Sequence, residues 1–143
     1  MASMDIILIS STSLIVELIV LGLLIVSYHI KRLKNYRRHG IIMTIAVVLH
    51  LVTIFSWMIW SFLTLFNGSV IDFLNPIIVV AFVHVPLGGI AAAFGVYLVT
   101  AWHLQLDIQG CFGRKRIMFI TFTAWLVSIA LGLILYLAVI MST

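Results

Sequence analysis

The chain has 143 residues, of which 64% are hydrophobic and 8% are charged, and its formal net charge is +4. Soluble globular domains carry about 25% charged residues, so this composition excludes an ordinary soluble domain. The mean hydropathy of +1.31 indicates an integral membrane protein instead.

Four apolar stretches are each long enough to cross a bilayer, which takes roughly 20 helical residues. Little of the chain lies outside them, so we predict a single domain over residues 1–143. Its expected fold is an all-α, antiparallel bundle of four transmembrane helices. The first stretch contains Glu17 and has no basic region before it, so we expect a retained helix and not a signal peptide. The predicted helices cover residues 5–28, 40–66, 76–102 and 117–141.

All eight lysines and arginines lie in two segments, one after the first predicted helix and one before the fourth. The positive-inside rule places both segments in the cytoplasm and both termini outside, in a multi-pass protein of the plasma membrane. This topology explains the net charge without a nucleic-acid partner and brings the basic segments to anionic lipid head groups. The single cysteine, Cys111, excludes an internal disulfide bond.

The outer half of the first predicted helix is polar, with hydroxyl side chains at residues 10–13 and a carboxylate at Glu17. A carboxylate near the middle of a bilayer must be protonated, paired or in contact with a wet cavity. We therefore expect Glu17 to face the interior of the bundle and to have a specific partner there. A protonated, locally bonded carboxyl is the alternative.

The second predicted helix begins next to His39 and carries His50 well inside its apolar stretch. Eleven residues turn a helix by about 1,100°, so the two imidazoles project in nearly the same direction. Phe55, Phe62 and Phe66 follow along one stripe. This stripe is expected to pack or to form an interfacial belt, and the wall of a planar cofactor pocket is the alternative.

The third predicted helix carries His84 and, two residues later, Pro86. Proline cannot bond to the carbonyl of Phe82, so we expect a kink or an unsatisfied carbonyl beside the imidazole. Small residues four positions apart, at 88–89 and 92–93, predict the close approach of another helix. The fourth predicted helix has few polar groups, and its expected packing points are Trp125 and Gly132.

Heights above the cytoplasmic surface follow from the helical rise of about 1.5 Å per residue. On this scale Glu17 and His50 are level, whereas His84 lies about 12 Å farther out, level with Ser13 and Tyr136. A haem clamped between His50 and His84 is therefore disfavoured unless the third helix is unwound at its proline.

Three tiers of polar groups are predicted in place of one clamped haem: an inner, a central and an outer tier. Imidazole is the usual ligand of haem iron, copper and zinc, so haem b and copper are the cofactors that these tiers suggest. The candidate cofactor-binding residues are His39, His50, His84 and His103, and the candidate metal ligands are His84, His50 and Glu17. The inner tier is His29, His39 and His103; the central pair is Glu17 and His50; the outer polar pocket is His84, Ser13 and Tyr136.

Three short segments share a pattern with a known family: Arg38-His39-Gly40-Ile41-Ile42-Met43, Val83-His84, and Arg114-Lys115-Arg116-Ile117 with Trp125, Gly132 and Tyr136. The pattern resembles the YozB/CtaM-like four-helix membrane proteins, a largely uncharacterised family that includes a maturation factor of a haem-copper terminal oxidase. The resemblance covers the second to fourth predicted helices and implicates His39 and His84. Arg114 stands where such proteins often have a histidine, so a ligand set inherited from the family would be incomplete here.

Three functional hypotheses follow. The first is a membrane-embedded haem- or metal-handling protein of the respiratory chain, either a b-type cytochrome in electron transport or an oxidase biogenesis factor. The second is a structural subunit of a larger membrane complex, held by the small-residue face of the third helix. The third is a small proton or solute transporter with Glu17, His50 and His84 as a polar path. Expected partners are a terminal oxidase or other membrane complex and a second copy of the chain. No Walker loop, GxSxG, HExxH or CxxC motif is present, so the sequence does not indicate an enzyme.

Overall fold

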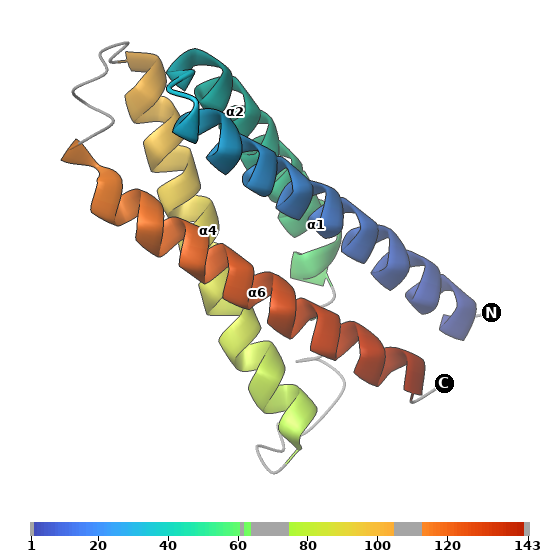
Figure 1. Cartoon of the computed structure of the whole chain (residues 1–143). Coiled ribbons are helices and arrows are strands. Elements are labelled where there is room, and N and C mark those ends of the chain that lie inside the picture. Colours follow the sequence, from blue (N-terminus) through green and yellow to red (C-terminus); the bar gives the residue numbers. More distant parts are fainter. Residues whose placement is uncertain (1, 61, 64–74, 105–112, 142–143) are drawn as a thin grey trace.

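The protein is described by a computed structural model over residues 2–60, 62–63, 75–104 and 113–141. In these residues the fold is all-helical (Figure 1), with α1 at Ala2–Arg32, α2 at Tyr36–Thr53, α4 at Pro76–Leu104 and α6 at Lys115–Met141. Four helices of the described chain are long and apolar enough to cross a membrane. The predicted all-α, multi-pass architecture is confirmed at this level.

The turn between the first two helices explains why both extend beyond their predicted ends. The apolar pattern predicts a loop over residues 29–39, but helical hydrogen bonding depends on the backbone and continues to Arg32. Lys34 then adopts a positive φ of 60°, the left-handed conformation that ends many helices. The side chain of Asn35 accepts a hydrogen bond from the backbone N–H of Arg38 and so caps α2.

α2 continues directly into η1, a π-helical segment at Ile54–Met58 that the apolar pattern of the sequence does not predict. π-Helical turns inside α-helices occur frequently at functional sites. This one begins four residues after His50, so it lies immediately beyond the central imidazole. The end of the second predicted helix, residues 64–66, lies outside the described residues.

α4 is a continuous helix through Pro86, so the proline does not end it. The start of this helix is capped by Asn75, whose side chain accepts a hydrogen bond from the N–H of Ile77 at 3.0 Å. Proline at the following position costs no hydrogen bond, because the first N–H groups of a helix have no partner within it.

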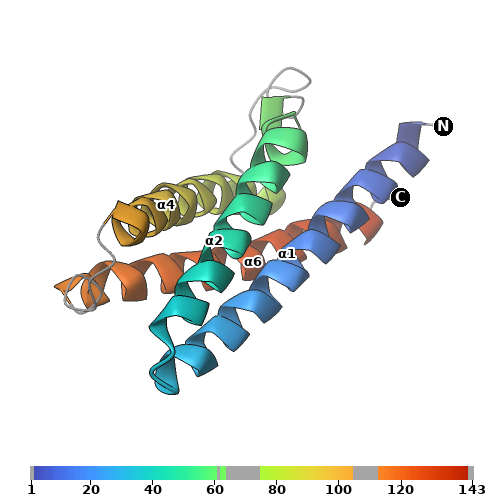
Figure 2. The same ribbon diagram turned by 90° about the horizontal axis from the view of Figure 1, so that it is seen from above.

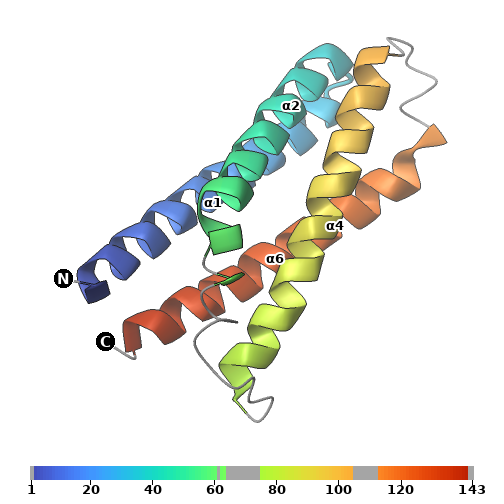
Figure 3. The same ribbon diagram turned by 180° about the vertical axis from the view of Figure 1, so that it is seen from behind.

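The helices are arranged in two closely packed pairs. α1 packs along α2, which Figure 2 shows from above, and α4 packs against α6, which it crosses in Figure 3. α1 also contacts α6, and α2 contacts α4. Both termini lie at the same end of the molecule (Figure 1). The antiparallel order across a membrane and its orientation stay predictions.

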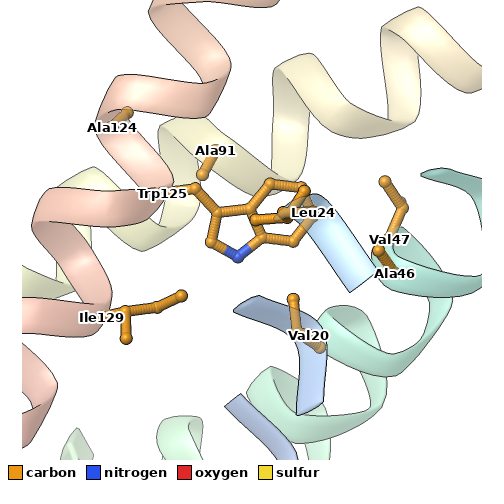
Figure 4. Close-up of a cluster of buried hydrophobic side chains, with 8 residues drawn as sticks. All are labelled: Val20, Leu24, Ala46, Val47, Ala91, Ala124, Trp125 and Ile129. Carbon is orange, nitrogen blue, oxygen red and sulfur yellow. The ribbon is translucent and has the colours of Figure 1, made fainter. Parts of the chain in front are cut away.

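Trp125 of α6 lies at the centre of the core, fully buried among residues from all four helices (Figure 4). Three alanines, one each from α2, α4 and α6, are among its neighbours, and their short side chains leave room for an indole between the helices. The cluster comprises Val20, Leu24, Ala46, Val47, Ala91, Ala124, Trp125 and Ile129. Trp125 was correctly expected to be a packing point.

Gly40 marks a second close contact, between α2 and the C-terminal end of α4. A Cβ atom built on Gly40 would overlap the indole of Trp102, whereas one built on Gly22 meets nothing within 4 Å. Trp102 can therefore approach α2 this closely because residue 40 has no side chain.

We expect Gly40→Ala to destabilise the protein by about 1–3 kcal/mol, because the added methyl group overpacks the contact with Trp102. The matched variant Gly22→Ala is expected to be neutral or slightly stabilising, since alanine is the better helix former by about 1 kcal/mol. Thermal unfolding of the purified variants in detergent measures both effects. Equal stability of the two variants would contradict the observed packing.

Candidate functional site

The centre of the bundle contains a buried ion-pairing arrangement between α1 and α2. Nδ1 of His50 lies 2.8 Å from Oε1 of Glu17. Glu17 is 6% exposed and His50 is 1% exposed. Glu17 is buried inside the bundle, where it was expected to have a specific partner. That partner is His50, which the helical rise places at the same height.

The other side of the His50 ring faces Trp125, with ring centroids 4.8 Å apart. Nε2 of His50 and Nε1 of Trp125 are both buried without a hydrogen-bond partner in the described part of the chain. Unpartnered buried polar groups are uncommon and call for an explanation such as a bound water, ion or ligand. An imidazole held by a carboxylate at one nitrogen and free at the other matches the way proteins orient metal-ligating histidines.

His39 is buried between α1 and α2 and is held by Ser27. Its Nδ1 lies 3.0 Å from the carbonyl oxygen of Ser27 and 2.7 Å from the hydroxyl oxygen, and that hydroxyl donates to the carbonyl of His39 at 3.3 Å. A carbonyl oxygen only accepts, so Nδ1 carries the proton. In the neutral imidazole Nε2 is then left with its lone pair.

His84 repeats this arrangement between α4 and α6, with Ser128 as its partner. Nδ1 of His84 donates to the carbonyl oxygen of Ser128 at 2.9 Å, and the Ser128 hydroxyl lies 3.5 Å from the His84 carbonyl. The same reciprocal serine–histidine contact therefore joins each of the two helix pairs. Nothing in the sequence singles out Ser27, because the partner of a histidine depends on how the two helices are rotated.

A cavity of about 290 Å³ lies beside His39, and we call it the inner cavity. Aromatic and aliphatic side chains line most of it, and three cationic side chains contribute to its wall. The cations are Lys31, Arg114 and Lys115, and the aromatic residues are Tyr28, Trp102, Phe119, Phe122 and Trp125.

A second cavity of about 290 Å³, the outer cavity, lies beside His84. It brings together the predicted outer polar pocket, because Ser13 and Tyr136 line it with His84, and Glu17 also reaches it. Tyr136 is positioned by a 3.0 Å hydrogen bond to the hydroxyl of Ser11. Glu17 thus contacts the outer cavity while Trp125 contacts the inner one, and His50 lies between them.

Other candidates are not gathered into these sites. His103 is exposed, 3.5 Å from the hydroxyl of Thr44, and its ring lies against Trp102. His103 and the exposed His29 line neither of the two cavities. The residues of the predicted aromatic stripe do not share one environment: Phe55 is exposed and Phe62 lines the outer cavity. Phe66 lies outside the described residues.

No three His, Cys, Asp or Glu side chains of the described chain lie close enough together to hold a metal ion. The three candidate metal ligands Glu17, His50 and His84 therefore do not form a single cluster. A metal ion that needs three or more such protein ligands has no preformed site among the described residues.

The chain was compared with protein-family models, curated proteins and solved structures, and none of them matches it. The resemblance to the YozB/CtaM-like proteins stays a prediction from the residues that carry it.

We expect Glu17→Ala to destabilise the protein by about 1–3 kcal/mol, because it leaves Nδ1 of His50 buried without an acceptor. Glu17→Gln keeps a carbonyl oxygen in the same place and should retain most of the stability. Unfolding of both variants in detergent tests this. If both unfold like the wild type, the pair contributes nothing to stability.

Proposed function

We propose that the protein is a membrane-embedded haem- or metal-handling protein of a respiratory chain, acting as a small b-type cytochrome or as an oxidase biogenesis factor. The observation that carries this proposal is the common state of three imidazoles. Nδ1 of His39, His50 and His84 is held by an oxygen atom, and Nε2 has no hydrogen-bond partner in the described part of the chain; His39 and His84 each line a cavity. Metal-ligating histidines are oriented by this kind of second hydrogen bond.

Haem is favoured over a bare metal ion by the number of ligands that the protein has to supply. The porphyrin occupies the equatorial positions of the iron, so one or two imidazoles complete the coordination. The absence of a three-residue cluster among the described residues is compatible with haem and unfavourable for a closed metal site. Copper remains the second candidate, because imidazole suits it.

The resemblance to the YozB/CtaM-like proteins supports the same function. Its two matched histidines, His39 and His84, are the two held by serine partners. The residues of the family's pattern in the fourth predicted helix also lie at the outer cavity. Tyr136 lines this cavity, and a Cβ atom built on Gly132 would lie 3.1 Å from the imidazole of His84. A haem-copper oxidase under assembly is the partner that this resemblance suggests.

We further propose the antiparallel topology with both termini outside the plasma membrane, and contact of the two basic segments with anionic lipids. Cross-contacts support the antiparallel order, since the end of α1 meets the start of α2 at Ser27 and His39, while the start of α1 meets the end of α6 at Ser11 and Tyr136. Assembly with another membrane protein or a second copy is supported by the exposed small residues Gly89 of α4 and, one turn later, Ala93.

A proton or solute transporter is the second candidate function. It is favoured by the position of the Glu17–His50 pair between the outer cavity, which Glu17 lines, and Trp125, which lines the inner cavity. Proton flux into liposomes that is lost in Glu17→Gln would favour this function over the first.

The protein purified from haem-replete cells, or mixed with haemin, is expected to show a Soret band that shifts on reduction. We expect the double variant His39→Ala/His84→Ala to lose the band, because both serine-held imidazoles are gone. The matched variant His29→Ala removes an exposed imidazole and should keep it. Absorption spectra and elemental analysis test this, and a wild-type protein that binds neither haem nor copper would contradict the proposed function.

Cys111 offers a direct test of the proposed topology, because it is the single thiol and lies between the third and fourth predicted helices. A membrane-impermeant maleimide should label it in inverted membrane vesicles and not in intact cells. The control is a Cys111→Ser variant with a cysteine introduced at Ser142, which should show the opposite labelling. Labelling of Cys111 from outside intact cells would contradict the proposed orientation.

A further inference from the structure

We propose that the inner cavity binds haem as an iron porphyrin, with Nε2 of His39 as an axial ligand and the cationic wall receiving the two porphyrin carboxylates. This inference rests on the proposed function and assigns it a particular cavity, ligand and set of anchoring charges.

The imidazole of His39 has the protonation and orientation that an iron ligand needs. Its Nδ1 donates to the carbonyl oxygen of Ser27, so the neutral ring presents a lone pair at Nε2. His39 is 9% exposed and lines the inner cavity. The hydroxyl of Ser27 also donates a hydrogen bond to the backbone carbonyl of His39. This bond holds α1 against α2 at the position of the imidazole.

The walls of the inner cavity suit a flat, apolar ring. Tyr28, Trp102, Phe122 and Trp125 contribute aromatic side chains from three helices. Trp102 takes its place in this wall because Gly40, beside His39, has no side chain to hold it away from α2. The cavity volume of about 290 Å³ is just below the usual range for small-molecule and cofactor sites, which begins at about 300 Å³.

Charge distinguishes the inner cavity from the outer one. Lys31, Arg114 and Lys115 line the inner cavity, and no Asp or Glu is among its described lining residues. The guanidinium of Arg114 is held in part by Tyr97, whose hydroxyl accepts a hydrogen bond from Nε at 3.4 Å. The outer cavity has the carboxylate of Glu17 and no Lys or Arg among its described lining residues. A dianionic ligand is therefore favoured in the inner cavity and disfavoured in the outer one.

An anionic phospholipid would satisfy the cations and the apolar walls, but it would leave the imidazole unused. The lone pair on Nε2 of a neutral His39 cannot bond to a phosphate oxygen, because both are acceptors. Iron accepts that lone pair. The combination of a free imidazole nitrogen, aromatic walls and a cationic wall therefore selects a porphyrin that contains iron.

The test is titration of the purified full-length protein in detergent with haemin, followed by its Soret band. Wild-type protein should bind haemin, and His39→Ala should weaken binding by more than about 100-fold, since loss of an outer-shell partner alone costs roughly 10–100-fold. Free imidazole added to the His39→Ala protein should restore the band of a histidine-ligated haem. His29→Ala, at the same membrane interface, should bind like the wild type.

A second variant removes the cations without disturbing buried residues. Lys31→Gln/Lys115→Gln should weaken haemin binding by about fivefold, in keeping with the modest strength of partly exposed ion pairs, and added salt should weaken the wild type likewise. The matched control is Lys34→Gln, because Lys34 lines neither cavity. Iron-free protoporphyrin measures the contribution of the walls and cations alone and should bind equally well to wild-type and His39→Ala proteins.

The outcomes separate this inference from the proposed function. Haemin binding that is lost in His84→Ala and retained in His39→Ala overturns the inner site and leaves the proposed function intact. Equal binding of haemin and protoporphyrin by the wild type, with no effect of His39→Ala, overturns the iron ligand and identifies a general site for anionic amphiphiles. A wild type that binds neither haem nor copper overturns both proposals.

Discussion

The structure depends on one constraint: a polar group surrounded by lipid has no water to bond with and must find its partner inside the bundle. Three contacts made by buried or half-buried histidines help to meet this demand, and they lie at three levels along the bundle. Ser27 and His39 join α1 to α2 at one end, Glu17 and His50 join the same helices at the centre, and Ser128 joins α6 to α4. Each contact fixes both the sliding and the rotation of a helix against its neighbour. The polar residues thereby determine the register that the uniformly apolar surfaces leave open.

Packing around Trp125 has a different cause from that in a water-soluble core. Helix association in lipid gains little from the hydrophobic effect, so it relies on close contact between helices that have short side chains. The alanines of α2, α4 and α6 around the indole provide that contact. Because the His50 ring rests on the same indole, the central imidazole is held by packing on one side and by Glu17 on the other. Each of these two rings keeps a nitrogen that is buried without a hydrogen-bond partner in the described part of the chain.

The two serine–histidine contacts give the molecule two similar imidazoles in dissimilar surroundings. His39 opens on a cavity with cations, and His84 opens on a cavity with Glu17 and hydroxyl groups. The central His50 lies between them and contacts neither cavity directly. Ligand chemistry at the two sites is therefore expected to differ through charge, although the imidazoles are held in the same way.

The sequence by itself determined the number and approximate extent of the membrane-crossing helices, because length and hydropathy are local properties. It also placed Glu17 level with His50, and His84 level with Tyr136, because helical rise converts residue number into height. Only the tertiary structure decided which way each side chain points. Helix rotation and crossing brought Ser27 to His39, separated His103 from the inner cavity, and divided the polar residues between two cavities. The apolar faces of these helices are nearly uniform, so the rotation depends on a few interhelical polar and small-residue contacts that no single segment reveals.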